Sequence, residues 1–482
     1  MPDGTLAVMA GKPISRRDAM VAAAAFTVCG CSRVETDRRR TSAGVVVNDV
    51  HAQISRTAMR EVVEPATVDA VADVLSKGNV SVGGGRYCAG GQPFLTMGRL
   101  LDTRKLDDVV VVNPERGTIT VQAGIRWTAL MEAINADAPG WAIRQKQSGA
   151  QRVTLGGTLA VNAHGRCLTA PPIVDDIESI DVLIDGKLVR CSRIENADRF
   201  ARVIGGYGLF GVMTAVTLKL VPRVKQMLRV EVVPIDEAVA RLDEAAARGA
   251  THGDFQYNVD DTSADFLKRG LLVTYEAADD ADPVRSVGAG NFTQLATLAH
   301  VDKPRAWALY RQQMLTASGA VNWNDAWQVA EYDEHYHRHV ESAIGAPPGS
   351  EVLSEMFVPR ESLSVLLGVM AAIVRRRGAN IIYGNVRLIE PDTVTRLPWA
   401  RGRYACVVFN QHIDQTLMSI ALARDTFRDI LDAVLELGGT FYLAHHTFAA
   451  GSQVDAAYPG LRQHLASADG GVRSDWLEKM SG

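Results

Sequence analysis

Residues 81–92 read SVGGGRYCAGGQ and place five glycines within twelve positions. The residues just before them, 79–82, alternate as a strand does, so the glycines are expected to form a turn at its end. Glycine tolerates positive φ and lets backbone N–H groups come close to a ligand. Successive amides in such a turn form an anion nest suited to a pyrophosphate. The stretch lacks the G-x-G-x-x-G of a Rossmann fold, and taken alone it equally fits a simple tight turn.

Two further glycine-rich segments follow in the same part of the chain. Residues 148–165 read SGAQRVTLGGTLAVNAHG, and residues 205–212 read GGYGLFGV. Each of them lies beside a predicted strand, as the first one does. Three such turns together favour one extended ligand that the protein contacts from three sides.

The pattern around these turns predicts both helices and strands. Residues 67–78 carry apolar positions at helical spacing, and Gly78 is a typical helix stop. Residues 175–192 predict a β-hairpin with Asp185 and Gly186 at its turn. Helices and strands mixed in this way indicate an α+β protein rather than an all-α or all-β one.

The character of the sequence changes near residue 224. Between residues 224 and 430, strands alternate with helices and glycine clusters are rare, which indicates a second α+β domain. Glycine turns return from residue 431 onward. The formal net charge of −4 argues against a nucleic-acid-binding protein, because such a protein usually carries a basic excess.

The three glycine segments together resemble those of flavoproteins of the vanillyl-alcohol oxidase and p-cresol methylhydroxylase (PCMH) family. Within that family the chain is most similar to sugar oxidases: the alditol and aldonolactone oxidases and decaprenylphosphoryl-ribose oxidase. The resemblance covers residues 45–223 and the C-terminal fifty residues. It implies an α+β fold of two domains. A split FAD-binding domain would comprise residues 45–223 and 431–482, and a substrate (cap) domain, residues 224–430, would be inserted between them.

The same resemblance implies that FAD is the cofactor and that the first glycine loop holds its pyrophosphate, with Arg86 fixing the shape of the loop. Many relatives carry a histidine in this loop that is joined covalently to the flavin. This chain has Tyr87 where that histidine falls, so FAD is expected to be bound non-covalently. The candidate FAD-binding residues are Gly83, Gly84, Gly85, Arg86, Tyr87, Cys88, Ala89, Ser148, Gly149, Ala150, Val153, Gly156, Gly157, Gly165 and Val212.

A flavin supplies the redox chemistry of alcohol oxidation, and the protein must supply a base for the hydroxyl proton. His445 stands where the ribose-oxidising relatives carry a lysine, and we expect it to be that base. His446 would face the opposite way if this segment is a strand. His164 matches a histidine near the substrate, unless it only satisfies its own turn. Glu355 matches an acidic or amide position of the substrate domain, unless it is a solvated strand residue.

Two predicted strands of the second domain carry further polar side chains. Alternation places Tyr383, Asn385 and Arg387 on one face of the first strand, and Tyr404 with Cys406 on one face of the second. A polar face of this kind is either solvated or lines a pocket, and the resemblance favours the pocket. Cys406 also fits a small core residue. Tyr383, Asn385, Tyr404 and Cys406 are therefore candidate substrate contacts, and Arg387 joins His445, His164 and Glu355 as a candidate catalytic residue.

These expectations predict a flavoenzyme that oxidises a CH–OH group of a sugar, alditol or aldonolactone by hydride transfer to flavin N5. The electron acceptor would be oxygen, a quinone or a cytochrome. Oxidation of a lipid-linked sugar is an alternative within the same chemistry. An alternative of another class is a flavin-binding scaffold without turnover, against which the polar residues at positions 164, 355, 387 and 445 argue.

The N-terminus resembles an export signal. Arg16 and Arg17 precede a short apolar run, residues 19–28, which is too short to span a bilayer. The pattern predicts a twin-arginine signal over residues 1–31, with Cys31 in a lipobox-like position. A polar linker, residues 32–44, would follow. The protein is thus expected to be exported to the periplasm or cell envelope, with lipidation at Cys31 as a means of membrane association and a disordered arm as the alternative.

No metal site is expected from the sequence. The stretch EHYHRH contains His335, His337 and His339, but it lies in a helix-rich region where side chains two positions apart diverge. The cysteines after residue 31 are scattered and lack the paired spacing of a zinc site. An exported protein with these cysteines is compatible with one disulfide and does not require a framework of them.

Overall fold

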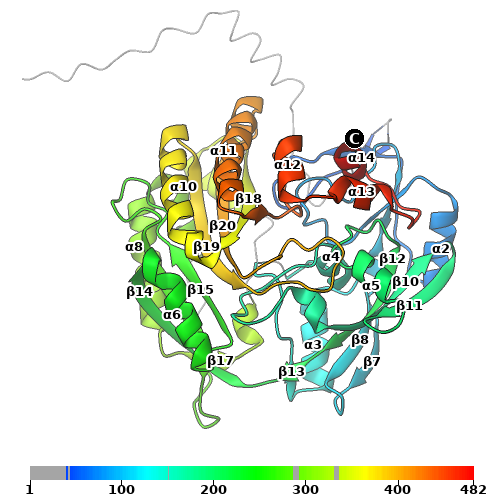
Figure 1. Cartoon of the computed structure of the whole chain (residues 1–482), viewed down its shortest axis with the longest axis horizontal. Helices are drawn as coiled ribbons and strands as arrows, with labels where there is room; N and C mark the ends of the chain where they lie inside the picture. The colour runs from blue at the N-terminus through cyan, green and yellow to red at the C-terminus, as the bar shows by residue number, and fades with distance from the viewer. Residues whose placement is uncertain (1–38, 42–43, 150, 286–291, 330–335, 482) are drawn as a thin grey trace, which may run out of the picture.

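The computed structural model describes residues 39–41, 44–149, 151–285, 292–329 and 336–481. Figure 1 shows two α+β halves side by side. The N-terminal half holds the blue-to-cyan elements, and the cap holds the green-to-orange elements. The red C-terminal helices lie over the N-terminal half. The α+β class predicted from the sequence is confirmed.

The N-terminal half combines several small sheets with short helices. Its elements are β1 (Arg39–Thr41), β2 (Gly44–Val47), β3 (Thr57–Met59), β4 (Glu61–Val63), α2 (Val68–Ser76), β5 (Val80–Gly83), β6 (Arg99–Asp102), β7 (Val109–Asn113), β8 (Thr118–Gln122), α3 (Trp127–Asp137), β9 (Trp141–Ala142), α4 (Leu155–Ala160), β10 (Ile177–Ile184), β11 (Lys187–Ser192), α5 (Ala197–Val203), β12 (Val212–Lys219) and β13 (Val221–Pro222). A parallel sheet has the order β4-β6-β5, and an antiparallel sheet has the order β11-β10-β12-β8-β7.

The helix stop at Gly78 and the turn at Asp185 and Gly186 form as the sequence predicted, and the structure adds a cap at Thr67. The side chain of Thr67 accepts a hydrogen bond from the backbone N–H of Ala70 and caps α2. Gly78 follows that helix with φ of 65°. Asp185 and Gly186 both have positive φ, 48° and 71°, which is the type I′ geometry that matches the twist of the β10–β11 hairpin.

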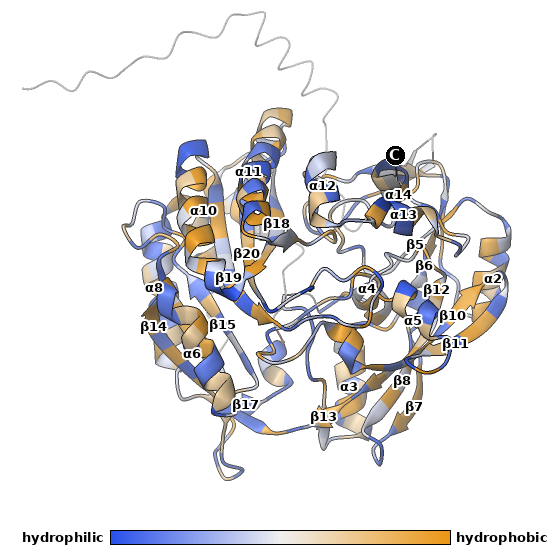
Figure 2. Cartoon of the chain, viewed as in Figure 1, coloured by the Kyte–Doolittle hydropathy of each residue, from blue (hydrophilic) through white to orange (hydrophobic). Residues whose placement is uncertain are grey.

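The cap is built on one antiparallel sheet whose helices pack against it. Its elements are β14 (Lys225–Pro234), α6 (Ile235–Ala247), β15 (His252–Tyr257), β16 (Arg269–Ala277), α7 (Phe292–Val301), α8 (Lys303–Ala317), β17 (Val321–Trp323), α9 (Tyr336–Ile344), β18 (Gly349–Pro359), α10 (Leu363–Arg377), β19 (Asn380–Ile389), β20 (Tyr404–Asp414), α11 (Leu417–Glu436) and β21 (Thr440–Phe441). The strand order is β17-β14-β16-β15-β19-β20-β18-β21. Figure 2 shows that α10 is largely hydrophobic and has a hydrophilic end, as expected of a helix that packs on a sheet.

The chain returns to the N-terminal half later than the sequence suggested. Helix α11 runs across the expected boundary between residues 430 and 431, and β21 still pairs with β18 of the cap. The apolar pattern of α11 continues without a break until Gly438, which has φ of 75° and ends the helical segment. Only the residues after β21 cross back, and they end in α12 (Gly451–Ala457), α13 (Leu461–Ala466) and α14 (Asp475–Ser481).

The return segment is tied directly to the sheet that precedes the glycine loop. Val472 forms a parallel bridge with Val80 of β5, and Arg473 donates its backbone N–H to the Val80 carbonyl at 2.8 Å. The Asp475 carboxylate accepts hydrogen bonds from the backbone N–H and hydroxyl of Thr96. The two chain segments that the resemblance assigns to one domain therefore share hydrogen bonds.

Several sequence expectations concern the N-terminus and the cysteines. The expected signal, with Arg16, Arg17 and Cys31, lies outside the described residues. Residues 39–41 of the expected linker form β1 and pair with β2. Of the cysteines in the described part of the chain, none forms a disulfide. No helix within the described ranges is both long enough and apolar enough to cross a membrane.

Candidate active site

The glycine loop after β5 packs against the segment that leads into α4. A Cβ atom on Gly84 would lie 2.1 Å from Thr154 Oγ1, and one on Gly85 would lie 2.8 Å from the Arg152 carbonyl oxygen. The Thr154 hydroxyl also accepts a hydrogen bond from the Gly157 backbone N–H and caps α4. Glycine is therefore required at position 84, because the loop and the start of α4 approach more closely than a side chain allows.

A pocket of about 110 Å³ opens beside this loop. Its lining is strongly basic and comprises Val50, Gly85, Arg86, Tyr87, Arg104, Arg126 and Arg152. Guanidinium groups bind phosphate oxygens with paired hydrogen bonds and keep their charge at any physiological pH. The donor set therefore fits a ligand that carries a diphosphate.

The other predicted cofactor residues surround the same loop or the segments behind it. Ser148 and Gly149 belong to the turn that precedes Val153, and Ala150 lies outside the described residues. Gly156 and Gly157 lie in the first turn of α4. Cys88 and Ala89 lie in the first glycine loop. At Gly165, an added Cβ atom would lie 2.7 Å from the Lys146 carbonyl oxygen. The Val212 side chain is buried in the apolar cluster beneath α2.

The end of the loop, at Gly90 and Gln92, contacts the C-terminal segment that returns from the cap. The Gln92 side-chain amide donates hydrogen bonds to the carbonyl oxygens of Leu443 and His445, both at 2.8 Å. Its own carbonyl accepts from the Gly90 backbone N–H at 3.0 Å. A Cβ on Gly90 would lie 2.5 Å from the His445 carbonyl oxygen. Residues 81–92 thus fix two features at once, the anion pocket at one end and the position of His445 at the other.

Replacing Gln92 with leucine should leave both of these carbonyl groups without their donor. Gln92 is buried, so we expect a loss of about 1–3 kcal/mol in the free energy of unfolding. The His445 segment should become less ordered, and any reaction that depends on His445 should slow. Thermal unfolding and single-turnover reduction of the purified protein check this. Equal stability and rate in the variant would show that Gln92 does not hold the segment.

Four polar side chains from separate parts of the chain meet in the buried interior where the cap faces the N-terminal half. His164 Nε2 lies 2.7 Å from Glu355 Oε2, and His445 Nε2 lies 3.5 Å from Glu355 Oε1. The Cys406 sulfur lies 3.7 Å from Glu355 Oε2 and 3.9 Å from His164 Nε2. The family resemblance predicted that these residues share one pocket. In the structure the other three side chains all lie close to Glu355.

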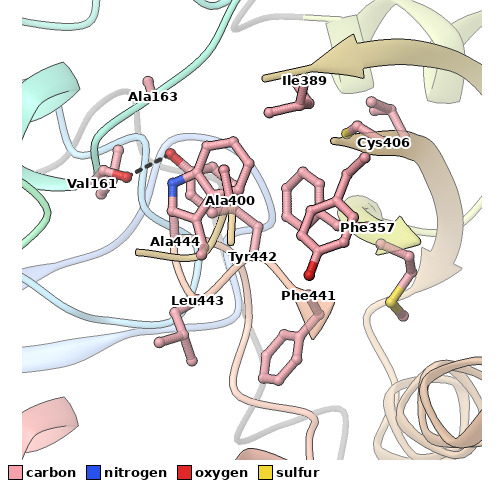
Figure 3. Packing of buried hydrophobic residues seen from close by; sticks show 14 of the residues in the cluster. Val161, Ala163, Phe357, Ile389, Ala400, Cys406, Phe441, Tyr442, Leu443 and Ala444 are labelled. Atoms are coloured by element: carbon pink, nitrogen blue, oxygen red, sulfur yellow. Dashed lines mark hydrogen bonds between the residues drawn. The ribbon is translucent and has the colours of Figure 1, made fainter. Parts of the chain in front are cut away.

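The surroundings of this cluster are aromatic and apolar. The His164 ring lies between Phe357, Trp399 and Tyr442, with ring centroids 6.0, 5.2 and 6.1 Å away. Figure 3 shows Phe357 and Cys406 together on the cap side, and Tyr442 on the return segment bonded to the Val161 carbonyl. A low-dielectric setting of this kind strengthens the attraction between the carboxylate and the imidazoles.

The charges of the cluster follow from its contacts. Burial raises the pKa of Glu355, but His164 and His445 outweigh burial and hold this pKa well below its usual value. Glu355 is therefore ionised at neutral pH. Burial and the Glu355 carboxylate both raise the pKa of the Cys406 thiol well above its usual value, so Cys406 stays a thiol and does not act as a thiolate nucleophile.

The two histidines of the cluster differ in their hydrogen bonds. His164 faces the Gly165 carbonyl through Nδ1 at 3.2 Å and the Glu355 carboxylate through Nε2. Both partners only accept, so both bonds form together only when each ring nitrogen carries a proton. His445 Nε2 has no hydrogen-bond partner within the described residues. His445 is thus the imidazole that is free to accept a proton.

The segment that carries His445 is not the strand that the sequence predicted. Strand β21 ends at Phe441, and His445 and His446 lie in an irregular turn. The Gln92 side chain, and not a neighbouring strand, donates hydrogen bonds to the carbonyls of Leu443 and His445. The β-sheet hydrogen bonding therefore does not continue through this turn. The two rings still diverge. His446 is buried, forms a hydrogen bond with the Ser354 hydroxyl at 2.8 Å, and stacks on the Phe448 ring. It is therefore a packing residue and not a solvated one.

Basic side chains lie on one side of the site, and of these only Arg387 was predicted from the sequence. Arg387 is buried in β19, and its Nε has no hydrogen-bond partner within the described residues. Lys146 is 1% exposed and donates to the Gln147 carbonyl at 2.8 Å. Burial, Arg166 and Arg387 lower the pKa of Lys146 to about 7. Arg166 in turn pairs with Asp254 at 3.4 Å. Lys146 and Arg166 carry no distinctive sequence pattern, and only their burial beside Arg387 reveals them.

The predicted substrate contacts divide into two groups. Asn385 donates its amide to the Tyr383 hydroxyl at 2.8 Å, as expected for two residues on one face of β19. Asn385 Oδ1 is buried without a partner among the described residues, and Tyr383 is 43% exposed. Cys406 contacts the Glu355 cluster. Tyr404 is also buried, but it packs on the far side of Phe357, with ring centroids 6.5 Å apart.

Comparison with known proteins assigns the class of the N-terminal half. Residues 59–192 match the family model described as an FAD binding domain. Residues 59–192 are therefore similar to an FAD-binding domain, as the glycine segments indicated. The arginine-lined pocket beside Gly85 fits the diphosphate of FAD, and the segments from Ser148 to Gly157 are the ones that would hold the rest of the cofactor.

The relatives of the chain include oxidases and dehydrogenases by name. L-galactono-1,4-lactone dehydrogenase 1 of Oryza sativa subsp. japonica is 30% identical over 130 residues, 27% of this chain and 22% of the relative. Alditol oxidase of a Streptomyces species is 29% identical over 170 residues, 34% of this chain and 39% of the relative. Cytokinin dehydrogenase 7 of Oryza sativa is 26% identical over 255 residues, 48% of this chain and 46% of the relative. The matches thus span less than half of each of these relatives.

Proposed function

We propose that this protein is an FAD-dependent oxidoreductase that oxidises a CH–OH group of a sugar, alditol or aldonolactone. The observation that carries the proposal is the buried cluster of His164, Glu355 and His445 on the cap side of an FAD-binding domain. Two of the relatives named above act, by their names, on a galactonolactone and on alditols. When bound, FAD supplies the acceptor for the hydride of the alcohol carbon.

His445 is the base of the proposed reaction. Its Nε2 is buried without a hydrogen bond among the described residues, and the ionised Glu355 lies 3.5 Å away. A positive charge that develops on His445 as it takes the hydroxyl proton is stabilised by this carboxylate. Both ring nitrogens of His164 are engaged, with the Gly165 carbonyl and the Glu355 carboxylate, so neither is available to accept that proton. Glu355 contacts both rings through its carboxylate and so helps to hold them in place.

The polar residues beside the cluster suit a polyhydroxylated substrate. Arg387 Nε and Asn385 Oδ1 are a buried donor and a buried acceptor without partners among the described residues. Unsatisfied buried groups are costly unless a ligand or water satisfies them. Vicinal hydroxyls or a lactone carbonyl would satisfy both. Lys146, whose pKa of about 7 leaves it readily deprotonated, and Arg166, paired with Asp254, lie near Arg387 and disfavour a cationic substrate.

A substrate panel tests this function. The FAD-loaded protein is mixed anaerobically with alditols, aldonolactones, phosphorylated sugars and a cytokinin, and the flavin absorbance is followed. Bleaching by an alditol or an aldonolactone supports the proposal. Bleaching by the cytokinin alone, or by none of the compounds, contradicts it. Re-oxidation by air, by a quinone or by cytochrome c then identifies the electron acceptor.

FAD should be released when the protein is denatured. Tyr87 stands where relatives carry the histidine that links to the flavin, and a phenol in this loop offers no imidazole nitrogen for that bond. After acid precipitation, the yellow colour should therefore remain in the supernatant. Colour retained in the washed pellet would show a covalent link at another residue and would overturn this expectation.

A further inference from the structure

A second cluster of potential metal ligands lies in the cap, apart from the Glu355 cluster. His412 Nδ1 lies 2.8 Å from Glu351 Oε1, and His300 Nε2 lies 3.8 Å from the same oxygen. The two imidazole rings stand at 88° with centroids 4.4 Å apart. One ligand atom from each of the three side chains lies within 4.8 Å of the others. The side chains of His300 and Glu351 are 3% and 0% exposed, and that of His412 is 15% exposed, so the cluster lies mostly inside the cap.

Three separate elements build this cluster. Glu351 of β18 and His412 of β20 are direct cross-strand partners, which fixes their side chains on one face of the sheet. His300 comes from the last turn of α7, which packs over this part of the cap. At Gly349 of β18, a Cβ atom would lie 2.3 Å from His412 Cε1. The glycine makes room for the imidazole ring at this position.

The chemistry of the three ligands is that of a protein zinc site. Two imidazole nitrogens and one carboxylate oxygen are a frequent zinc donor set, with metal–ligand distances of about 2.0–2.2 Å. An imidazole ligand must be neutral. Small shifts of the three side chains would bring their ligand atoms to the separations that one ion requires.

The cluster is separate from the proposed catalytic site. Glu351 and Glu355 lie four residues apart on the same strand and on the same face, a separation of about 13 Å at the rise of a β-strand. A metal at Glu351 would therefore not contact the Glu355 carboxylate. Its effect would be to join α7 to β18 and β20, further along the strand that carries Glu355.

We propose that His300, Glu351 and His412 bind a divalent metal ion of the zinc class and that this ion is structural. Its three ligands come from a helix and two strands, so it cross-links the cap in the folded state only. Binding to the folded state alone stabilises that state in proportion to ligand concentration. The proposal does not depend on the redox activity or on its substrate.

The test uses the full-length, FAD-loaded protein without an affinity tag. Chelator-treated protein is dialysed against Zn²⁺, and the zinc content and melting temperature are measured. We expect about one Zn²⁺ per chain and a higher melting temperature with Zn²⁺ than with chelator. The variants His300→Gln and His412→Gln should each bind little zinc and lose the zinc-dependent rise. His300→Gln alters only the end of a helix, so it tests the proposal even if His412→Gln disturbs the sheet.

Two control variants locate the ion. Glu355→Gln changes the other cluster that has metal-type ligands, formed by His164, Glu355 and Cys406. A triple variant replaces His335, His337 and His339 with glutamine. Both controls should retain zinc. Absence of zinc binding by the unmodified protein, zinc retained by His300→Gln and His412→Gln, or zinc lost instead from either control would each overturn the proposal.

Discussion

Replacing Glu355 with glutamine is expected to leave FAD bound and to slow substrate-driven flavin reduction by about 10²–10⁴-fold, the usual contribution of a positioned general base. Glutamine keeps the size of the side chain but removes the charge that faces His164 at 2.7 Å and His445 at 3.5 Å. Without that charge, a proton taken up by His445 loses the anion that stabilises it, and His164 Nε2 loses its ionised partner. Anaerobic stopped-flow reduction at saturating substrate measures the effect.

A matched control separates this effect from a general loss of charge. Glu361 is exposed and lies six positions further along the chain. Glu361→Gln should therefore reduce its flavin at the rate of the unmodified protein. His445→Ala should slow reduction about as much as Glu355→Gln, and the double variant should be little slower than either single one, because the two residues act as a unit. Effects that multiply in the double variant would show that Glu355 and His445 act independently.

Replacing Gly84 with alanine is expected to yield protein that is largely free of FAD. The new methyl carbon would lie 2.1 Å from Thr154 Oγ1 and 3.0 Å from Thr154 Cγ2, so the glycine loop must move away from the start of α4. Overpacking of this kind typically costs about 1–3 kcal/mol, and here it would distort the wall of the arginine-lined pocket. The ratio of flavin to protein absorbance after purification, together with the melting temperature, measures the loss.

A second substitution on the opposing side provides the control. Thr154→Ala removes both of the clashing atoms, and alone it should cost about 1 kcal/mol, because the α4 cap is lost. In the Gly84→Ala and Thr154→Ala double variant, the closest remaining contact is the Thr154 Cβ position at 3.1 Å. The double variant should therefore recover part of the FAD. No recovery would mean that contacts other than Thr154 set the requirement for glycine at position 84.

The N-terminal half shows which structural features local sequence signals could predict. Gly83, Gly84 and Gly85 predicted a turn after a strand, and Gly78 predicted the end of α2. Signals of this kind are strong because φ preferences and capping act within a few residues of the chain. Strand alternation likewise placed Asn385 and Tyr383 side by side. The same rule failed at His445, since alternation applies only while the chain stays in a sheet, and β21 ends at Phe441.

The amino-acid sequence by itself determined the α+β class, the glycine loops that shape an FAD site, and the residue types available for proton transfer. Only the tertiary structure decided which of these residues meet. His164 and Glu355 are 191 positions apart, and Gln92 reaches the His445 carbonyl across 353 positions. The pairing of Glu351 with His412 depends on the register between β18 and β20. Such contacts are set by how sheets and helices pack over the whole chain, and no local pattern encodes them.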